Sequence, residues 1–299
     1  LLTMANNETL TDEHIRIAHI GNSIQYYNDC PRLLESIFKD HYGSYKVTQD
    51  SCLRGGASLV SIWTKGNGMA TKFATPNAIR PDGTYDIGRS SVQELLESEK
   101  WDFVIMNDHT QSPARNETKE NTMNILAKEY LPLLSKSNKT SVVVFLMTAA
   151  YRRPVNGSDD LGSFEDFTMQ LHSGYAAYKD LIPNSKVAPV GLAFQHIKDH
   201  YSQNKDCATF SWEMLYARDD FHPSPHGTLL QAFVLFITLT GQVPPVYSAS
   251  WWGTARYMQP PEEDPLPLPS LEEGALLRSV ACTVCNLSVD GRHPKSAAS

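Results

Sequence analysis

The sequence predicts an α/β protein in which a mostly parallel, five-stranded sheet lies between two layers of helices. Apolar runs of strand length alternate five times with helical patterns, and this alternation is typical of parallel βαβ units. The strand runs are apolar at successive positions, as expected of strands buried on both faces. Polar turns follow several of these runs, and open α/β sheets hold their ligands at that end of the strands.

The first strand is expected at 15–20 and stops at Gly21-Asn22-Ser23, after which Pro31 opens a helical pattern that fades at Gly43. The spacing of Ser91 and Glu94 matches a capping box at the start of another helix. The remaining strands are expected at 45–52, 101–106, 141–147 and 186–190. The remaining helices are expected at 90–99, 122–134, 165–181, 194–200 and 227–240.

Three segments follow from changes in composition. Residues 1–14 form an N-terminal extension, 15–245 form one α/β domain, and 246–299 form a proline-rich, poorly structured C-terminal tail. Within the domain, 64–89 are rich in Gly, Pro, Asn and Thr without clear periodicity. We expect them to form a long surface insertion.

The overall composition excludes several classes of function. The chain has 299 residues, of which 41% are hydrophobic, and a net charge of −7. This acidic balance is not that of a protein with a basic nucleic-acid footprint. No apolar run is long enough to cross a bilayer, so we expect no integral membrane segment. No signal peptide is visible, but the chain begins at Leu1 rather than at a methionine, so this decides nothing.

Cysteines and glycosylation sequons bear on the compartment. Cys282 and Cys285 form a C-x-x-C pair without a second pair, which favours a local disulfide or two plain thiols over a zinc site. N-x-[ST] sequons occur more often than the loose pattern would produce by chance. We therefore expect a secreted or lumenal glycoprotein. The sequons lie at Asn7, Asn116, Asn138, Asn156 and Asn286.

The polar residues after the strands include a set suited to nucleophilic catalysis. Ser23 follows the first strand and is the candidate nucleophile. A serine hydroxyl needs a general base, and the base needs a carboxylate that fixes its tautomer. Asp219 and His222, three residues apart in one turn, have the spacing for both roles. His226, one helical turn further on, competes for the role of the base.

A tetrahedral intermediate also needs donors for its oxyanion. The backbone N–H groups of Ser23 and Gly56 and the side-chain amide of Asn107 are the candidates, because each follows one of the first three strands. Gly55 competes with Gly56 for this role, and Gln111 competes with Asn107. Three aromatic residues near the strand ends, Tyr26, Tyr27 and Trp63, are candidates for lining an acyl or sugar pocket.

Four short runs of residues that contain these candidates, taken in chain order, resemble the conserved sequence blocks of the SGNH or GDSL-type esterases and lipases. Gly21-Asn22-Ser23 is similar to the Gly-Asp-Ser block, Gly56-Ala57-Ser58 to the oxyanion glycine block, and Asn107-Asp108 to the Asn-Asp block. The run 219–227 is similar to the Asp-x-x-His-Pro block. Two positions depart from the family pattern: Asn22 replaces an aspartate, and Met106 stands where a glycine usually precedes the asparagine.

The resemblance covers roughly residues 15–242 and implies a flavodoxin-like α/β/α fold. It also implies ester hydrolysis through an acyl-enzyme, without a metal or organic cofactor. The expected substrate is a small-molecule or glycan ester, with an acetylated carbohydrate or short-chain acyl ester ahead of a lipid ester. Two alternatives are acyl transfer at the same site and an SGNH scaffold that binds a glycan or ester without turning it over.

Overall fold

The computed structural model of the chain describes residues 14–43, 46–71, 78–79, 84–137, 139–155, 157–201, 210–253 and 266–288. Five parallel strands form the body of one sheet in the order β2-β1-β5-β6-β7. The predicted parallel five-stranded sheet is confirmed. Its strands are β1 (His14–Gly21), β2 (Lys46–Leu53), β5 (Phe103–Met106), β6 (Val142–Leu146) and β7 (Ser185–Ala188).

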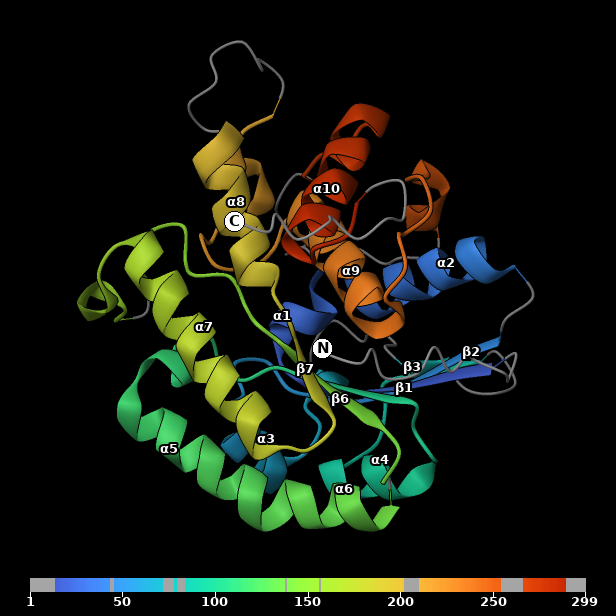
Figure 1. Cartoon of the computed structure of the whole chain (residues 1–299). Helices are drawn as coiled ribbons and strands as arrows, with labels where there is room; N and C mark the ends of the chain where they lie inside the picture. The colour runs from blue at the N-terminus through green and yellow to red at the C-terminus, as the bar shows by residue number, and fades with distance from the viewer. Residues whose placement is uncertain are drawn as a thin grey trace, which may run out of the picture.

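Helices cover both faces of the sheet (Figure 1), as the predicted three-layer α/β/α arrangement requires. One layer contains α2 (Cys30–Tyr42), α8 (Val190–Tyr201), α9 (Pro225–Thr240) and α10 (Leu271–Val284). The other contains α3 (Leu59–Lys65), α4 (Val92–Ser98), α5 (Asn116–Ile125), α6 (Leu131–Ser137) and α7 (Phe164–Leu181). Among the described residues, no helix is long and apolar enough to span a membrane.

Successive residues of each central strand enter opposite hydrophobic cores. In β1, Ile17 packs with the layer of α2 and α9, whereas Ala18 packs with the layer of α4 and α7. In β6, Val144 and Phe145 divide between the cores in the same way. A strand that is buried on both faces has no polar alternation, which is why these runs are apolar at consecutive positions.

The strand order reverses at β1, because β2 pairs with one edge of it and β5 with the other. Such a switch point leaves a crevice at the carboxyl ends of the two strands whose connections run to opposite sides. The residues that follow β1, β2 and β5 therefore meet at one end of the sheet.

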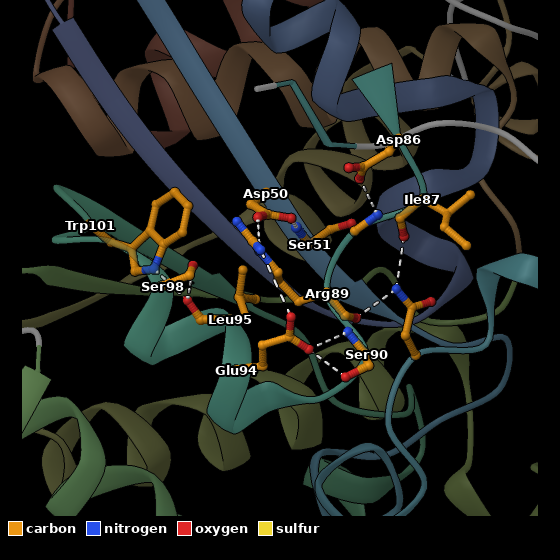
Figure 2. A network of polar contacts seen from close by, with 12 residues as sticks. Asp50, Ser51, Asp86, Ile87, Arg89, Ser90, Glu94, Leu95, Ser98 and Trp101 are labelled. Atoms are coloured by element: carbon orange, nitrogen blue, oxygen red, sulfur yellow. Dashed lines mark hydrogen bonds and ion pairs between the residues drawn. The ribbon is translucent and has the colours of Figure 1, made fainter. Parts of the chain in front are cut away.

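The insertion at 64–89 contributes two short strands rather than loop alone. β3 (Ala78–Ile79) pairs antiparallel with β2, and β4 (Tyr85–Asp86) pairs with β3, which extends the sheet at this edge. Two-residue strands carry no periodicity, so the sequence did not predict them. Figure 2 shows how the following segment is fastened to β2: Arg89 Nε donates to Asp50 Oδ2 at 2.6 Å, and the Arg89 guanidinium also faces Glu94.

The helix expected at 122–134 is longer than predicted. It begins with α5 at Asn116, passes through the π-helical turn η4 (Leu126–Tyr130) and ends with α6 at Ser137. Its first residues are polar and mostly exposed, so they carry no apolar stripe that would have marked the start of the helix.

The expectation of a poorly structured tail at 246–299 is wrong for 266–288 and for 246–253, where the short 3₁₀ helix η7 (Ala249–Gly253) buries Trp251 and Trp252. Ser270 caps α10 through a capping box with Glu273, and α10 packs against α9 and α8. Leu277, Val280 and Ala281 are fully or nearly fully buried in the same core as α9. Their i, i+3, i+4 spacing is that of an amphipathic helix, and the proline-rich segment before it hid this pattern. Residues 254–265 and 289–299 of the expected tail lie outside the described residues, as do residues 1–13 of the expected extension 1–14, whose last residue, His14, begins β1.

Gly274 tests whether this packing contributes to stability. A Cβ at Gly274 would lie 2.1 Å from the Tyr247 ring, and that ring is held because its hydroxyl donates to Pro269 O and accepts from Trp252 Nε1. Overpacking typically costs about 1–3 kcal/mol, against a gain in helix propensity of up to about 1 kcal/mol. We therefore expect Gly274→Ala to lower the free energy of unfolding. Gly253→Ala, with no heavy atom within 4 Å of the new Cβ, is the control. Equal stability of the two variants would contradict a packed α10.

Candidate active site

Ser23 lies at the carboxyl end of β1, where a sharp turn leads into the short helix α1 (Ser23–Tyr26). The turn requires glycine at position 21: φ is +154°, and a Cβ would fall 1.9 Å from Asn107 Oδ1. Asn22 caps α1 by accepting the Ile24 N–H at Oδ1. The strand, the glycine and the cap together fix the backbone that presents Ser23.

Asn22 is buried and holds three strand ends together. Its Nδ2 donates to Ala57 O at 2.8 Å, after β2, and to Asp108 O at 3.1 Å, after β5. A carboxylate has no donor and would make neither bond. Asparagine at position 22 can therefore make two hydrogen bonds that an aspartate could not. This departure from the family pattern leaves Ser23, His222 and Asp219 unchanged.

The structure brings together the three predicted residues of that set. His222 Nε2 lies 2.7 Å from Ser23 Oγ, and His222 Nδ1 lies 2.6 Å from Asp219 Oδ2. Asp219 Oδ1 also accepts the backbone N–H groups of Phe221 and His222. These distances place a serine hydroxyl, an imidazole and a carboxyl group in one hydrogen-bonded row.

The ionisation of Asp219 fixes the tautomer of the imidazole. Burial acts to raise the pKa of Asp219, but the hydrogen bonds and charge of His222 and the neighbouring backbone N–H groups outweigh it and hold this pKa below its usual value. An ionised carboxylate is an acceptor only, so His222 Nδ1 carries the proton. His222 Nε2 then has its lone pair toward the Ser23 hydroxyl, which is the arrangement that proton removal from serine requires.

Aromatic rings hold the imidazole in place. The Tyr27 ring stacks on His222 with a centroid distance of 4.2 Å and an interplanar angle of 7°, and the Phe221 ring lies 4.1 Å away at 40°. Asp220 has φ of +69° and turns away from the row toward Arg152, with which it forms an ion pair. The stack of Tyr27 on His222 could not be predicted from local spacing, because the two residues are distant in the chain.

His226 lies away from Ser23. It is 2% exposed, and its Nε2 lies 3.2 Å from Glu273 Oε2 of α10. Burial lowers the pKa of His226 more than its hydrogen bond with Glu273 raises it. Its side chain therefore joins α9 to α10 and does not contact Ser23, so the geometry favours His222 over His226 as the partner of the serine.

A cavity of about 290 Å³ opens over Ser23 and His222. Gly55 and Gly56 both border it, and among the described residues no acceptor pairs with either backbone N–H. Gly56 has φ of +67°, which favours glycine, and no heavy atom lies within 4 Å of a Cβ placed there. The Ser23 N–H begins α1 and has no earlier helical carbonyl to pair with. The cavity thus presents backbone donors next to the hydroxyl, and both glycines remain candidates.

The expectation that Asn107 faces the substrate is corrected by its position. Its side chain is fully buried, and both amide hydrogens are used: Nδ2 donates to Asn22 Oδ1 at 2.8 Å and to Asp108 O at 3.1 Å. Its Oδ1 accepts from Asn22 N–H and from Gln25 Nε2. Asn107 therefore supports the turn that carries Ser23 from beneath and has no donor left for an oxyanion.

We expect Asn107→Ala to act mainly on stability. The change leaves Asn22 N–H and one Gln25 N–H without the bonds they now make, whereas Asn22 Oδ1 keeps its bond with Ile24 N–H. Each unpaired buried group costs about 1–3 kcal/mol. The free energy of unfolding should fall by at least about 2 kcal/mol on this basis. Chemical denaturation of the variant measures it. Unchanged stability combined with a hundredfold loss of turnover would instead return Asn107 to the oxyanion hole.

Gln111, the alternative to Asn107, does not border the cavity either. Its Oε1 accepts from Nε and Nη2 of Arg115, both at 3.1 Å. Of the aromatic candidates, Tyr26 and Tyr27 border the cavity, whereas Trp63 packs against Tyr130. Within the described residues, no group of three or more His, Cys, Asp or Glu side chains is placed to hold a metal ion.

Comparison with known proteins agrees with this architecture. The sequence matches no family model and no curated protein. Among solved structures, it is similar to a protein from Slackia heliotrinireducens provisionally described as an SGNH hydrolase. That likeness has 24% identity and a TM-score of 0.52, and covers 76% of this chain and 99% of that one. A DUF4886 family protein from Bacteroides uniformis has 17% identity and a TM-score of 0.61, with 91% and 95% covered. The fold of the chain is thus an SGNH-like α/β/α fold.

Proposed function

We propose that the chain is a serine esterase that hydrolyses carboxylic esters through an acyl-enzyme. The observation that carries this proposal is the row of hydrogen bonds from Ser23 Oγ through His222 to Asp219, with spacings of 2.7 and 2.6 Å, at the floor of a cavity. A scaffold that only binds its ligand has no physical need for a hydroxyl, a correctly tautomerised imidazole and a carboxylate in this order.

In acylation, Ser23 Oγ bonds to the ester carbonyl carbon while its proton passes to His222 Nε2. Asp219 stabilises the resulting imidazolium, and the N–H groups of Ser23 and of Gly56 or Gly55 donate to the carbonyl oxygen as it becomes negative. Collapse breaks the bond to the alcohol oxygen, which takes the proton from His222. Water then repeats the sequence on the acyl-enzyme and releases the acid.

The cavity favours a small, uncharged ester. Its described lining contains no Asp, Glu, Lys or Arg side chain and includes the rings of Tyr26, Tyr27, Tyr151 and Phe221. A volume of about 290 Å³ lies at the lower end of the range of small-molecule sites. Aromatic rings with polar tips suit a ligand that is apolar on one side and hydroxylated on the other. We therefore favour an acetylated carbohydrate or another short-chain acyl ester over a lipid ester.

The compartment is part of the same proposal. Asn116 and Asn286, two of the five sequon asparagines, are exposed, which supports a glycosylated, secreted or lumenal protein. Asn7, Asn138 and Asn156 lie outside the described residues. Cys282 and Cys285 are free thiols in the structure, so the C-x-x-C pair provides no disulfide in support.

A fluorophosphonate probe tests the proposed function directly. We expect one adduct per molecule, mapped by peptide mass spectrometry to Ser23, because only a serine with an adjacent general base attacks the phosphorus quickly. Prior incubation with an aryl acetate should slow the labelling, and heat-denatured protein should not be labelled. Absence of labelling in the folded protein, or an adduct on a different serine, would refute the proposed function.

A further inference from the structure

The oxyanion site built so far contains backbone donors only. Serine hydrolases gain about 10²- to 10³-fold in kcat from a single added donor at the oxyanion. The side chain expected to supply that donor, Asn107, is buried and has both amide hydrogens engaged. His109, two residues after Asn107, borders the cavity instead.

His109 borders the same cavity as Ser23, Gly56 and His222. Its ring is partly exposed, and within the described part of the chain neither ring nitrogen has a hydrogen-bond partner. This sets it apart from Asn107 and Asp108, the two polar side chains between β5 and His109, which are hydrogen-bonded within the protein. Within this lining, His109 thus offers a side-chain donor with no partner in the protein.

We propose that the imidazole of His109 is the side-chain donor of the oxyanion hole, acting with the backbone N–H groups of Ser23 and Gly56. This inference rests on the proposed function and assigns a further catalytic residue to it. In this role, the ring N–H of His109 donates a hydrogen bond to the carbonyl oxygen of the substrate rather than to a group of the protein.

The backbone of His109 is held rigidly, as preorganised transition-state stabilisation requires. Its N–H donates to Asp108 Oδ1 at 2.8 Å, and its carbonyl accepts the Ser112 N–H at 2.8 Å. Asp108 is in turn fully buried and receives the Leu59 N–H, the Thr122 hydroxyl and the Tyr178 hydroxyl. The turn that carries His109 at the cavity is therefore tied to α3, α5 and α7.

The charge state of the ring also suits a donor. Burial lowers the pKa of His109, and the charge of Asp108 only partly offsets this. At neutral pH the imidazole is therefore neutral, with one N–H to donate and no proton to compete with His222 for the role of general acid. A neutral imidazole that polarises a carbonyl is an established device in enzymes.

The test compares His109→Ala and His109→Phe with wild type and with His172→Ala, a control at an exposed histidine of α7. Steady-state hydrolysis of an aryl acetate is measured for each. We expect both His109 variants to lose about 10²- to 10³-fold in kcat with little change in KM, because the bond forms mainly in the transition state. The phenylalanine keeps the ring volume, so loss in both variants cannot come from a collapsed cavity.

Two further readouts separate a donor from a structural residue. Affinity for an aryl trifluoromethyl ketone, which forms an oxyanion adduct with serine, should fall by the same factor as kcat/KM. Either His109→Asn or His109→Gln should recover at least tenfold over alanine: the asparagine amide lies near the Nδ1 position and the glutamine amide near Nε2. The better of the two identifies the ring nitrogen that donates.

The outcomes distinguish this inference from the proposed function. An active, fluorophosphonate-labelled wild type with a fully active His109→Phe would overturn the role of His109 alone. A rise in KM at unchanged kcat would also overturn it, since that pattern indicates ground-state binding. A wild type that neither hydrolyses esters nor is labelled would remove the proposed function and this role with it.

Discussion

Ser23→Ala is expected to lower kcat for an aryl acetate by about 10⁴- to 10⁶-fold, the usual cost of removing a member of a catalytic triad. Alanine leaves His222 and Asp219 in place but provides no oxygen to form the acyl-enzyme. Water attack assisted by the remaining donors would account for whatever activity survives. Fluorophosphonate labelling should vanish with the activity. Both measurements use protein whose folding has been checked by its melting temperature.

Ser98→Ala is the matched control. The Ser98 hydroxyl donates to Leu95 O within α4 and does not border the cavity, so this variant should hydrolyse the ester and accept the probe as wild type does. Retention of more than a few per cent of wild-type turnover by Ser23→Ala would rule out Ser23 as the nucleophile. That result would point to direct attack by water or to a different serine.

The strands of this protein could be predicted because their environment leaves a simple trace in the sequence. Ile17 and Ala18 enter different cores, and a strand buried on both faces must be apolar throughout. The paired position of Asp219 and His222 could also be predicted, because both lie in one turn and local spacing determines their separation. The contact of Ser23 with His222 could not follow from local spacing. What predicts it is the order of the four blocks that resemble those of the SGNH esterases and lipases.

The role of Asn107 was mispredicted for a related reason. Side chains alternate in direction only within a strand, and β5 ends at Met106, so alternation does not predict where the side chain of Asn107 points. Sequence alone does not show whether the next polar side chain turns inward to support the Ser23 turn or outward to the cavity. In the structure Asn107 is buried and His109 borders the cavity. The sequence favours the asparagine because its residue type suits a donor, whereas burial determines which donor is available.

Replacement of His222 by alanine is the second change with a very large expected effect. Without a base 2.7 Å from Ser23 Oγ, the hydroxyl keeps its proton at neutral pH, and kcat should fall by about 10⁴- to 10⁶-fold.

His226→Ala is the control of the same residue type, since His226 lies against Glu273 and not against Ser23. It should leave kcat per folded molecule within about twofold of wild type, because it removes no group that contacts the substrate. It should also lower the free energy of unfolding by roughly 1–3 kcal/mol, because Glu273 loses a partner between α9 and α10. Measuring kcat and chemical denaturation for both variants separates the two roles. If His226→Ala loses turnover and His222→Ala does not, the base is His226, and the hydrogen-bonded row at Ser23 has a different purpose.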